Sequence, residues 1–145
     1  MVKPYSGEEL RSQLPRQLDW HNTYVVIVTG AKLNPCGHAL LNIGAVGGYY
    51  FHVAEVYGHP RYMVEAGYRR YLREEGKQEI RRHPVTVDNS SSAEHRLYDL
   101  MGKDWLWGIL PHNCAAFVEE VIQAGGSRAG SYSNCPSAEV FRGPL

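Results

Sequence analysis

The sequence predicts a single α+β domain over residues 1–145, in which a central antiparallel sheet packs against helices. Three observations favour this class. The length suits one domain, and no linker, internal repeat or low-complexity block divides the chain. Strand patterns cluster in the middle of the chain. Helix patterns lie toward both ends, rather than alternating with strands as in a parallel sheet.

The first two elements come from a capping pattern and a β-branched run. Ser6-Gly7-Glu8-Glu9 matches a capping box and predicts a short helix that ends near Pro15. Residues 23–30 are rich in Val, Ile and Thr, which favour a pleated and buried strand. A loop that carries Asn34-Pro35-Cys36-Gly37 follows this strand.

The next two strands form a predicted hairpin. Residues 38–45 and 49–56 have strand composition, and Val46-Gly47-Gly48 between them is typical of a hairpin turn. His38 opens the first strand of this pair, and His52 lies within the second. If the two side chains share a face, their rings are near neighbours on adjacent strands.

Three further elements follow the hairpin. Residues 66–75 predict a helix that stops at Gly76. Residues 79–87 predict a returning strand at a sheet edge or with a break, because Pro84 has no N–H for a ladder hydrogen bond. The pattern Ser-Ser-Ala-Glu at residues 91–94 is a second capping box, and it predicts a helix through about residue 101.

The composition excludes several function classes. Fifteen basic and fifteen acidic side chains balance, so a broad basic face for nucleic acid is not indicated. No apolar run approaches the roughly 20 residues that a membrane span needs, and the first residues lack the apolar region of a signal peptide. We therefore expect a soluble protein made in the cytoplasm, with export by a route that needs no signal peptide left open.

A cysteine lies in the first turn of the last predicted helix. Cys114, Phe117, Val118, Val121 and Ile122 fall on one apolar helical face, and Gly125-Gly126 ends the pattern. Asn113 is a good N-cap. Unpaired N–H groups and the helix dipole at this end stabilise a thiolate over a thiol, so Cys114 is a candidate nucleophile.

These residues together resemble a known family. A His at the start of a strand, a second His on the next strand and a later Asn-Cys-x-x-Phe at a helix start are similar to the circularly permuted papain-like, NlpC-type cysteine hydrolases. That clan includes lecithin:retinol acyltransferase-like proteins. The resemblance covers roughly residues 24–125, and it implies a sheet packed against the helix that carries the catalytic Cys.

The resemblance implies roles for individual residues. Cys114 would be the nucleophile, His38 the general base and His52 the group that orients His38. The backbone N–H of Cys114 would stabilise the oxyanion, with a second donor from a neighbouring loop. The hydroxyls of Tyr24, Tyr49 and Tyr50 are candidates for that donor.

Tyr49, Tyr50, Asn113 and Trp107 are the candidate substrate-binding residues. Core packing is the alternative for Trp107 and for the partner Trp105. No cofactor and no metal are expected in the catalytic group.

Two departures from the family bear on the substrate. Lipid-acting relatives carry Glu-His between the Cys and the Phe, where this chain has Ala115-Ala116, and the His38–His52 spacing is slightly long. The resemblance then implies cleavage of an amide in a peptide or a peptidoglycan stem peptide. A small catalytic domain of this kind resembles an antibacterial effector, for which a cognate inhibitor (immunity) protein would be a partner. An acyltransferase or lipid deacylase of the same clan is the alternative enzyme.

The three cysteines also allow non-catalytic interpretations. Cys36 and His38, with His112 and Cys114, supply four potential zinc ligands, although a one-residue gap between ligands is unusual for structural zinc. A zinc-stabilised binding module is therefore the contrasting function. Cys36 and Cys135 could pair in an oxidising compartment or stay reduced. The arginines near residues 69–73 and 81–82 alternate with acids, which is typical of a solvated face.

Overall fold

The computed structural model describes residues 3–10, 14, 16–29, 37–53, 57–58, 60–102, 105–106 and 113–127, with the backbone alone at 57–58, 105–106 and 113–115. Its helices are α1 (Glu65–Glu75), α2 (Ser90–Met101) and α3 (Asn113–Ala124). Its strands are β1 (Glu8–Glu9), β2 (Thr23–Val28), β3 (His38–Ile43), β4 (Tyr49–His52), β5 (Tyr57–Gly58), β6 (Arg61–Val64), β7 (Glu79–Val85) and β8 (Trp105–Leu106).

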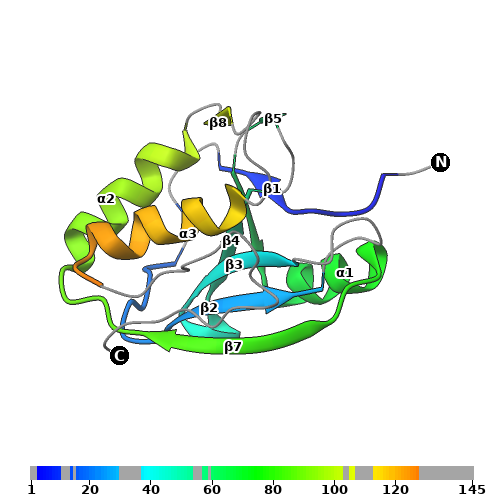
Figure 1. The fold of residues 1–145 in the computed structure, drawn as a ribbon, viewed down its shortest axis with the longest axis horizontal. Helices are drawn as coiled ribbons and strands as arrows, with labels where there is room; N and C mark the ends of the chain where they lie inside the picture. The colour runs from blue at the N-terminus through cyan, green and yellow to red at the C-terminus, as the bar shows by residue number, and fades with distance from the viewer. Residues whose placement is uncertain are drawn as a thin grey trace.

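Six of the strands form one antiparallel sheet in the order β1-β6-β4-β3-β2-β7, while β5 and β8 pair separately. The predicted α+β class with an antiparallel sheet is therefore confirmed. Figure 1 shows α2 and α3 side by side next to the sheet, with α1 apart from both. The predicted edge position of the strand that contains Pro84 is also confirmed, because β7 is the last strand in this order.

Alternate residues of the central strands form two different faces. On one face, which we call the α2–α3 face, apolar side chains of β2, β3 and β4 pack against the two helices. Its buried members include Val25, Ile27, Leu41, Phe51, Leu97, Phe117, Val118, Val121 and Ile122. On the other, the α1 face, Val26, Val28, Leu40, Tyr50 and Met63 pack against Tyr68 and Tyr71 of α1.

The hairpin between β3 and β4 is held by a buried amide. The chain turns through one 3-10 turn at Ala45–Gly47, which begins one residue before the predicted turn at residues 46–48. The side-chain amide of Asn42 donates to the carbonyl oxygens of Ala45 and Tyr49, each at 3.1 Å. Because these carbonyls have a partner inside the protein, the turn closes without burying unpaired backbone groups.

Several helix and strand ends follow the predictions. The helix after β6 ends at Gly76, which has the expected left-handed conformation with a φ of 66°. The last helix spans Asn113–Ala124, as the apolar spacing predicts. Two strands end earlier than predicted: β2 ends at residue 28 and not at 30, and β7 ends at residue 85 and not at 87.

Two of the predicted helix starts are wrong. Glu8 and Glu9 form strand β1, which pairs with Tyr62 and Arg61 of β6, so the capping-box pattern does not start a helix there. Pairing with β6 satisfies these backbone groups in an extended conformation, and Gly7 before them has a φ of 107°, outside the helical region. The second helix begins earlier than predicted, because the Asn89 side chain accepts from the Ser92 N–H and is the N-cap.

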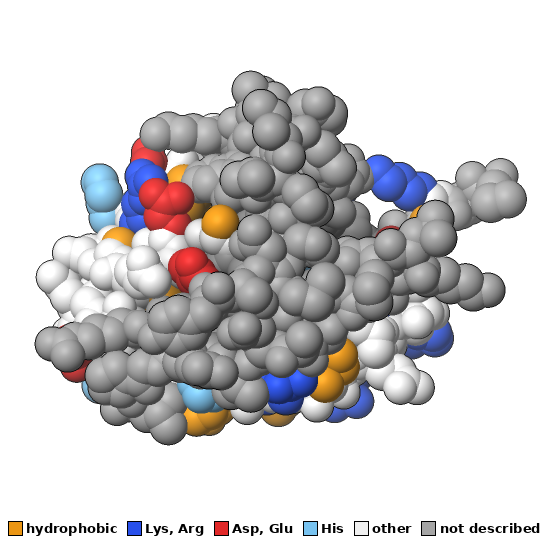
Figure 2. Space-filling view, in the orientation of Figure 1, with side chains coloured by type: hydrophobic (Ala, Val, Ile, Leu, Met, Phe, Trp, Pro, Cys, Tyr) orange, Lys and Arg blue, Asp and Glu red, His pale blue; other side chains and the backbone are white. Residues whose placement is uncertain are grey.

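The outer surface of α2 and α3 is charged in both signs. Acidic and basic side chains gather next to each other over these helices in Figure 2. Arg96 of α2 pairs with Asp99 and with Glu120 of α3, which ties the two helices together. Within the described part of the chain, no helix is long and apolar enough to cross a membrane.

Candidate functional site

The two histidines of the hairpin are in direct contact. Nε2 of His38 lies 2.8 Å from Nδ1 of His52, and the two rings meet edge to face with centroids 5.0 Å apart. The register explains the contact. Leu41 pairs with Phe51 and Asn42 with Tyr50, so His52 lies opposite residue 40 and diagonal to His38 on the same face. The predicted adjacency of the two rings is confirmed.

His52 is held on every side by the interior of the protein. Its side chain is fully buried, and its Nε2 lies 2.7 Å from the carbonyl oxygen of Ser6. The ring of Tyr71 in α1 meets it edge-on, with centroids 5.1 Å apart. His38 is half-buried and is the first residue of β3, so it lies at the end of the sheet. One ring is thus fixed in the core and the other reaches the boundary.

Burial favours the neutral form of both rings. Burial lowers the pKa of His52 to about 4, against the opposing effect of its bond to the Ser6 carbonyl, and the charges of Arg61 and Lys77 lower it further. Burial also holds the pKa of His38 well below its ordinary value, with added repulsion from His52 and Lys77. A neutral imidazole is the form that accepts a proton from a nucleophile.

The hydrogen bonds determine which ring atom accepts that proton. A carbonyl oxygen accepts and never donates, so the proton of His52 lies on Nε2, which faces Ser6. In a neutral ring Nδ1 then carries a lone pair, and Nε2 of His38 donates to it. The remaining nitrogen of His38, Nδ1, is unprotonated and carries the lone pair at the outer end of this hydrogen-bonded series. This assignment makes Nδ1 of His38 the basic atom.

Helix α3 places the backbone of Cys114 in its first turn, as predicted. The last turn lies beside the start of α2, because the Asn89 N–H donates to the Gly125 carbonyl at 2.9 Å. α2 follows the end of β7 at Val85. Val85 pairs with Thr23, and Thr23 pairs with Ile43, so Ile43 lies at the same end of the sheet as the start of α2. The first turn of α3 consequently points toward the opposite end of the sheet, where β3 begins at His38 (Figure 1).

The sheet itself lies between α3 and the histidine rings. Phe117 and Ile122 of α3 pack on the α2–α3 face, whereas His52 contacts Tyr71 on the α1 face. Because side chains alternate along a strand, His38 and His52 point away from the face that α3 covers. The sheet therefore separates the histidine rings from the described apolar side chains of α3.

The other predicted site residues differ in what the structure describes. Tyr49 and Tyr50 are buried in opposite faces, with 2% and 0% of their surface exposed, so both have packing roles. Tyr24 is partly buried against the α1-face cluster. The side chains of Asn113 and Cys114 lie outside the described residues. The whole of Trp107, Cys36, His112 and Cys135 also lies outside them.

A polar network on the α1 face was not predicted. Arg82 donates to the Tyr50 hydroxyl at 2.8 Å and to Glu79 at 2.8 Å, and its guanidinium lies over the Tyr50 ring. The Tyr50 hydroxyl donates to Glu65 at 2.7 Å, and the Tyr68 ring stacks on Tyr50 with centroids 4.0 Å apart. The expectation of a solvated arginine face is wrong for Arg82, because β7 turns this residue toward α1.

For the neighbouring arginines of α1 the same expectation is confirmed. Arg69 and Arg70 form exposed ion pairs with Glu65 and Glu74 one helical turn away. Among the residues that the structure describes, no group of three or more His, Cys, Asp or Glu side chains is placed to hold a metal ion.

Comparison of the chain with protein-family models, with curated proteins and with solved structures found no match.

Proposed function

We propose that this protein is a cysteine hydrolase with a circularly permuted papain-like fold, in which Cys114 is the nucleophile, His38 the base and His52 the orienting group. The observation that carries the proposal is the hydrogen-bonded chain from the Ser6 carbonyl through His52 to His38. It supplies a neutral imidazole with a lone pair on Nδ1, and a nucleophile needs such a base. The backbone of Cys114 in the first turn of α3 supplies the other half of the pair.

The proposed reaction runs through a thioester. His38 Nδ1 takes the proton of the Cys114 thiol, and the thiolate sulfur bonds to the amide carbonyl carbon of the substrate. The tetrahedral intermediate collapses as the C–N bond breaks, and His38 returns the proton to the leaving amine. Water then attacks the thioester with His38 again as base, which releases the acid and restores the thiol. The Cys114 N–H stabilises the oxyanion in both steps.

The position of His38 at the end of β3 fits this mechanism. Helix α3 and the histidine rings belong to opposite faces of the sheet, so the proposal requires Cys114 to reach His38 around the strand end. β3 has six residues and α3 has twelve, which correspond to lengths of about 20 Å and about 18 Å. With the last turn of α3 at the Ile43 end, the proposal requires the first turn to lie near the His38 end.

The proposed substrate is an amide in a peptide or a peptidoglycan stem peptide, and the proposed setting is an antibacterial effector with a cognate inhibitor protein. Ala115-Ala116 supports the amide over an acyl lipid, because lipid-acting relatives carry Glu-His at these positions. The balanced charge of the chain gives no reason to favour a nucleic-acid or strongly anionic substrate.

Alkylation by iodoacetamide tests the proposed nucleophile. At pH 7, Cys114 should react roughly tenfold faster than Cys36 and Cys135, as a thiolate with a depressed pKa would. Peptide mapping by mass spectrometry gives the three rates in one sample. His38→Ala should slow Cys114 to the rate of the other two thiols, whereas His95→Ala, at an exposed position of α2, should leave it unchanged. Equal rates for all three cysteines in the native protein would contradict the assignment.

Digestion assays test the substrate. Purified peptidoglycan, a phospholipid panel and acyl thioesters should be incubated separately with the native protein and with Cys114→Ala. We expect cleavage of peptidoglycan peptides by the native protein and none by the variant. Release of fatty acid in place of amines would overturn the amide assignment and favour the lipid-acting alternative.

A further inference from the structure

The N-terminal segment at residues 5–9 reaches the histidine pair from the far edge of the sheet. Ser6 is 46 residues away from His52 in sequence, yet its carbonyl oxygen lies 2.7 Å from His52 Nε2. The Ser6 residue is itself buried, with 8% of its surface exposed. Ser6 contacts the buried imidazole through its backbone carbonyl. The identity of its side chain therefore gives no sign of this role in the sequence.

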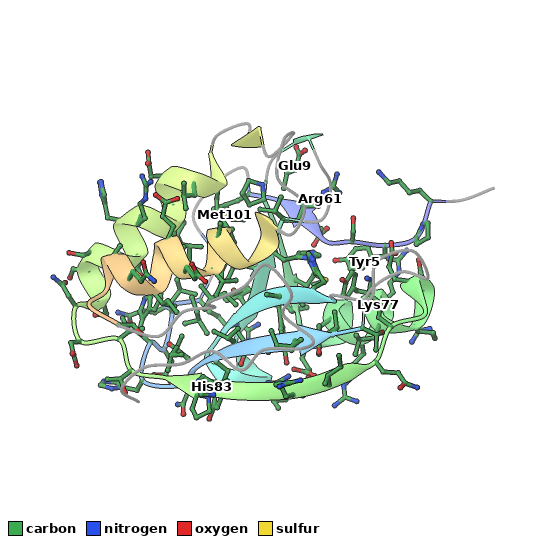
Figure 3. All side chains as sticks on the ribbon, in the orientation of Figure 1. Tyr5, Glu9, Arg61, Lys77, His83 and Met101 are labelled. Carbon is green, nitrogen blue, oxygen red and sulfur yellow. The ribbon has the colours of Figure 1, made fainter. Side chains whose placement is uncertain are left out.

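This segment is fastened on both sides of Ser6. Before it, the Tyr5 N–H donates to Glu74 at 2.9 Å, and Arg70 lies over the Tyr5 ring at 4.4 Å, which ties the chain to α1. After it, Arg61 donates to the Gly7 carbonyl at 3.2 Å. Figure 3 shows Tyr5 beside α1, and it shows Glu9 next to Arg61 where β1 meets β6.

The backbone at Gly7 turns the Ser6 carbonyl toward His52. Gly7 has a φ of 107°, which side chains of L-residues rarely adopt. A Cβ at this position would lie 3.0 Å from the Tyr62 carbonyl oxygen and 3.0 Å from Arg61 Cβ. Both the positive φ and the close neighbours require glycine at this position. The turn before β1 is therefore specified by the sequence as well as by the pairing of β1 with β6.

We propose that residues 5–9 are a positioning element for the histidine pair: the Ser6 carbonyl holds the His52 proton on Nε2 and thereby leaves the lone pair of His38 on Nδ1. Without this acceptor, a neutral His52 can place its proton on Nδ1, facing His38. Nε2 of His38 would then have to accept, and the lone pair would leave Nδ1. Docking of the N-terminal segment thus selects between a basic and a non-basic outer atom on His38.

The consequence for catalysis rests on the proposed function, but the proton positions do not. Long-range ¹H–¹⁵N NMR spectra of the ¹⁵N-labelled full chain at pH 7.5 distinguish protonated from unprotonated ring nitrogens. We expect both His38 and His52 to carry their proton on Nε2. A wild-type protein with the His52 proton on Nδ1 would overturn the proposal, whatever its activity.

Gly7→Ala tests the link to the segment. The new methyl group should move the Ser6 carbonyl, populate both forms of His52 and raise the solvent exchange of its ring N–H at least tenfold. Gly126→Ala is the matched control, because Gly126 has a φ of 91° and an added Cβ would meet only Asp88 Cβ at 3.8 Å within 4 Å. It should leave both rings unchanged. Unchanged ring protons in Gly7→Ala, with the Glu8 and Glu9 amides exposed, would overturn the proposal.

A second variant serves if Gly7→Ala does not fold. Arg61→Met removes the donor to the Gly7 carbonyl and keeps an apolar stem over the sheet. It should shift the His52 proton populations in the same direction and to a smaller degree. The outcome is separable from the proposed function, because Cys114→Ala should abolish hydrolysis and keep the wild-type ring protons. Expected ring protons without any hydrolysis would refute the function and uphold the positioning role.

Discussion

The two faces of the central sheet come from the same strands and yet have opposite chemistry. The α2–α3 face buries apolar side chains such as Leu41, Phe51 and Phe117. The α1 face buries His52 and Asn42 among its apolar residues, and it places the Arg82 guanidinium against Tyr50. Buried polar groups destabilise a fold unless each has a partner, so the α1 face depends on hydrogen-bond geometry. We conclude that the α2–α3 face is held by apolar packing, whereas the α1 face combines apolar packing with a defined set of hydrogen bonds.

Truncation on the α2–α3 face should have the largest effect on stability. Phe117→Ala removes a fully buried ring and should lower the free energy of unfolding by about 3–5 kcal/mol. Leu72→Ala on the partly buried side of α1 should cost about 1 kcal/mol. Urea denaturation followed by circular dichroism measures both variants. A loss below that of Leu72→Ala would break the distinction between the faces.

Acidification should act through the α1 face. The pKa of folded His52 is about 4, below its ordinary 6.5, so between these values the unfolded chain binds the proton and the folded chain does not. The contribution of neutral His52 to the free energy of unfolding is therefore fully present above pH 6.5 and is lost as the pH drops toward 4. From pH 7 to pH 5 the loss from His52 alone should be roughly 2 kcal/mol, and His38 acts in the same direction.

The control for this prediction is His52→Gln, which cannot gain the proton. Its unfolding free energy should change less over the same pH range, because the His52 contribution has been removed. Restricting the measurement to pH 5–7 separates the histidines from carboxylates such as Glu79, whose pKa is lowered and which lose their contribution at lower pH. An identical pH slope in both proteins would show that His52 is not buried as a neutral ring.

The smallest expected change in stability comes from a comparison of two arginines on the α1 side, Arg82 and Arg69. Arg82→Met removes the guanidinium that donates to both the Tyr50 hydroxyl and Glu79. It should lower the free energy of unfolding by about 1–2 kcal/mol. Arg69→Met is the matched control, because its ion pair with Glu65 is exposed and should contribute less than about 0.5 kcal/mol. Chemical denaturation of the two variants distinguishes them. Equal losses would mean that Arg82 behaves as a surface residue.

Local signals were reliable where the chain needed no distant partner. The β-branched run of β2 predicts its strand, Gly76 predicts the end of α1, and the apolar spacing after Asn113 predicts α3. The capping-box pattern at residues 6–9 was misleading, because those residues are extended by pairing with β6. β6 itself has four residues and no local signal strong enough to predict it.

The candidate site divides in the same way. The hairpin pattern predicts that His38 and His52 are close, because two strands joined by a short turn bring their residues together in register. It does not reveal the Ser6 carbonyl, which contributes a backbone atom from 46 residues away. Arg82 resembles a solvated arginine in sequence, and only the pairing of β7 with β2 brings it under α1.

The sequence by itself determined the α+β class, the histidine hairpin and the helix that begins at Asn113, because short-range periodicity and turn residues specify each of them. The tertiary structure alone decided that the histidines and α3 belong to opposite faces and that residues 5–9 close the hydrogen-bond chain. These features depend on strand register and on contacts between distant segments. Alternation along a strand turns a one-residue difference in register into a change of face, and no local pattern carries that information.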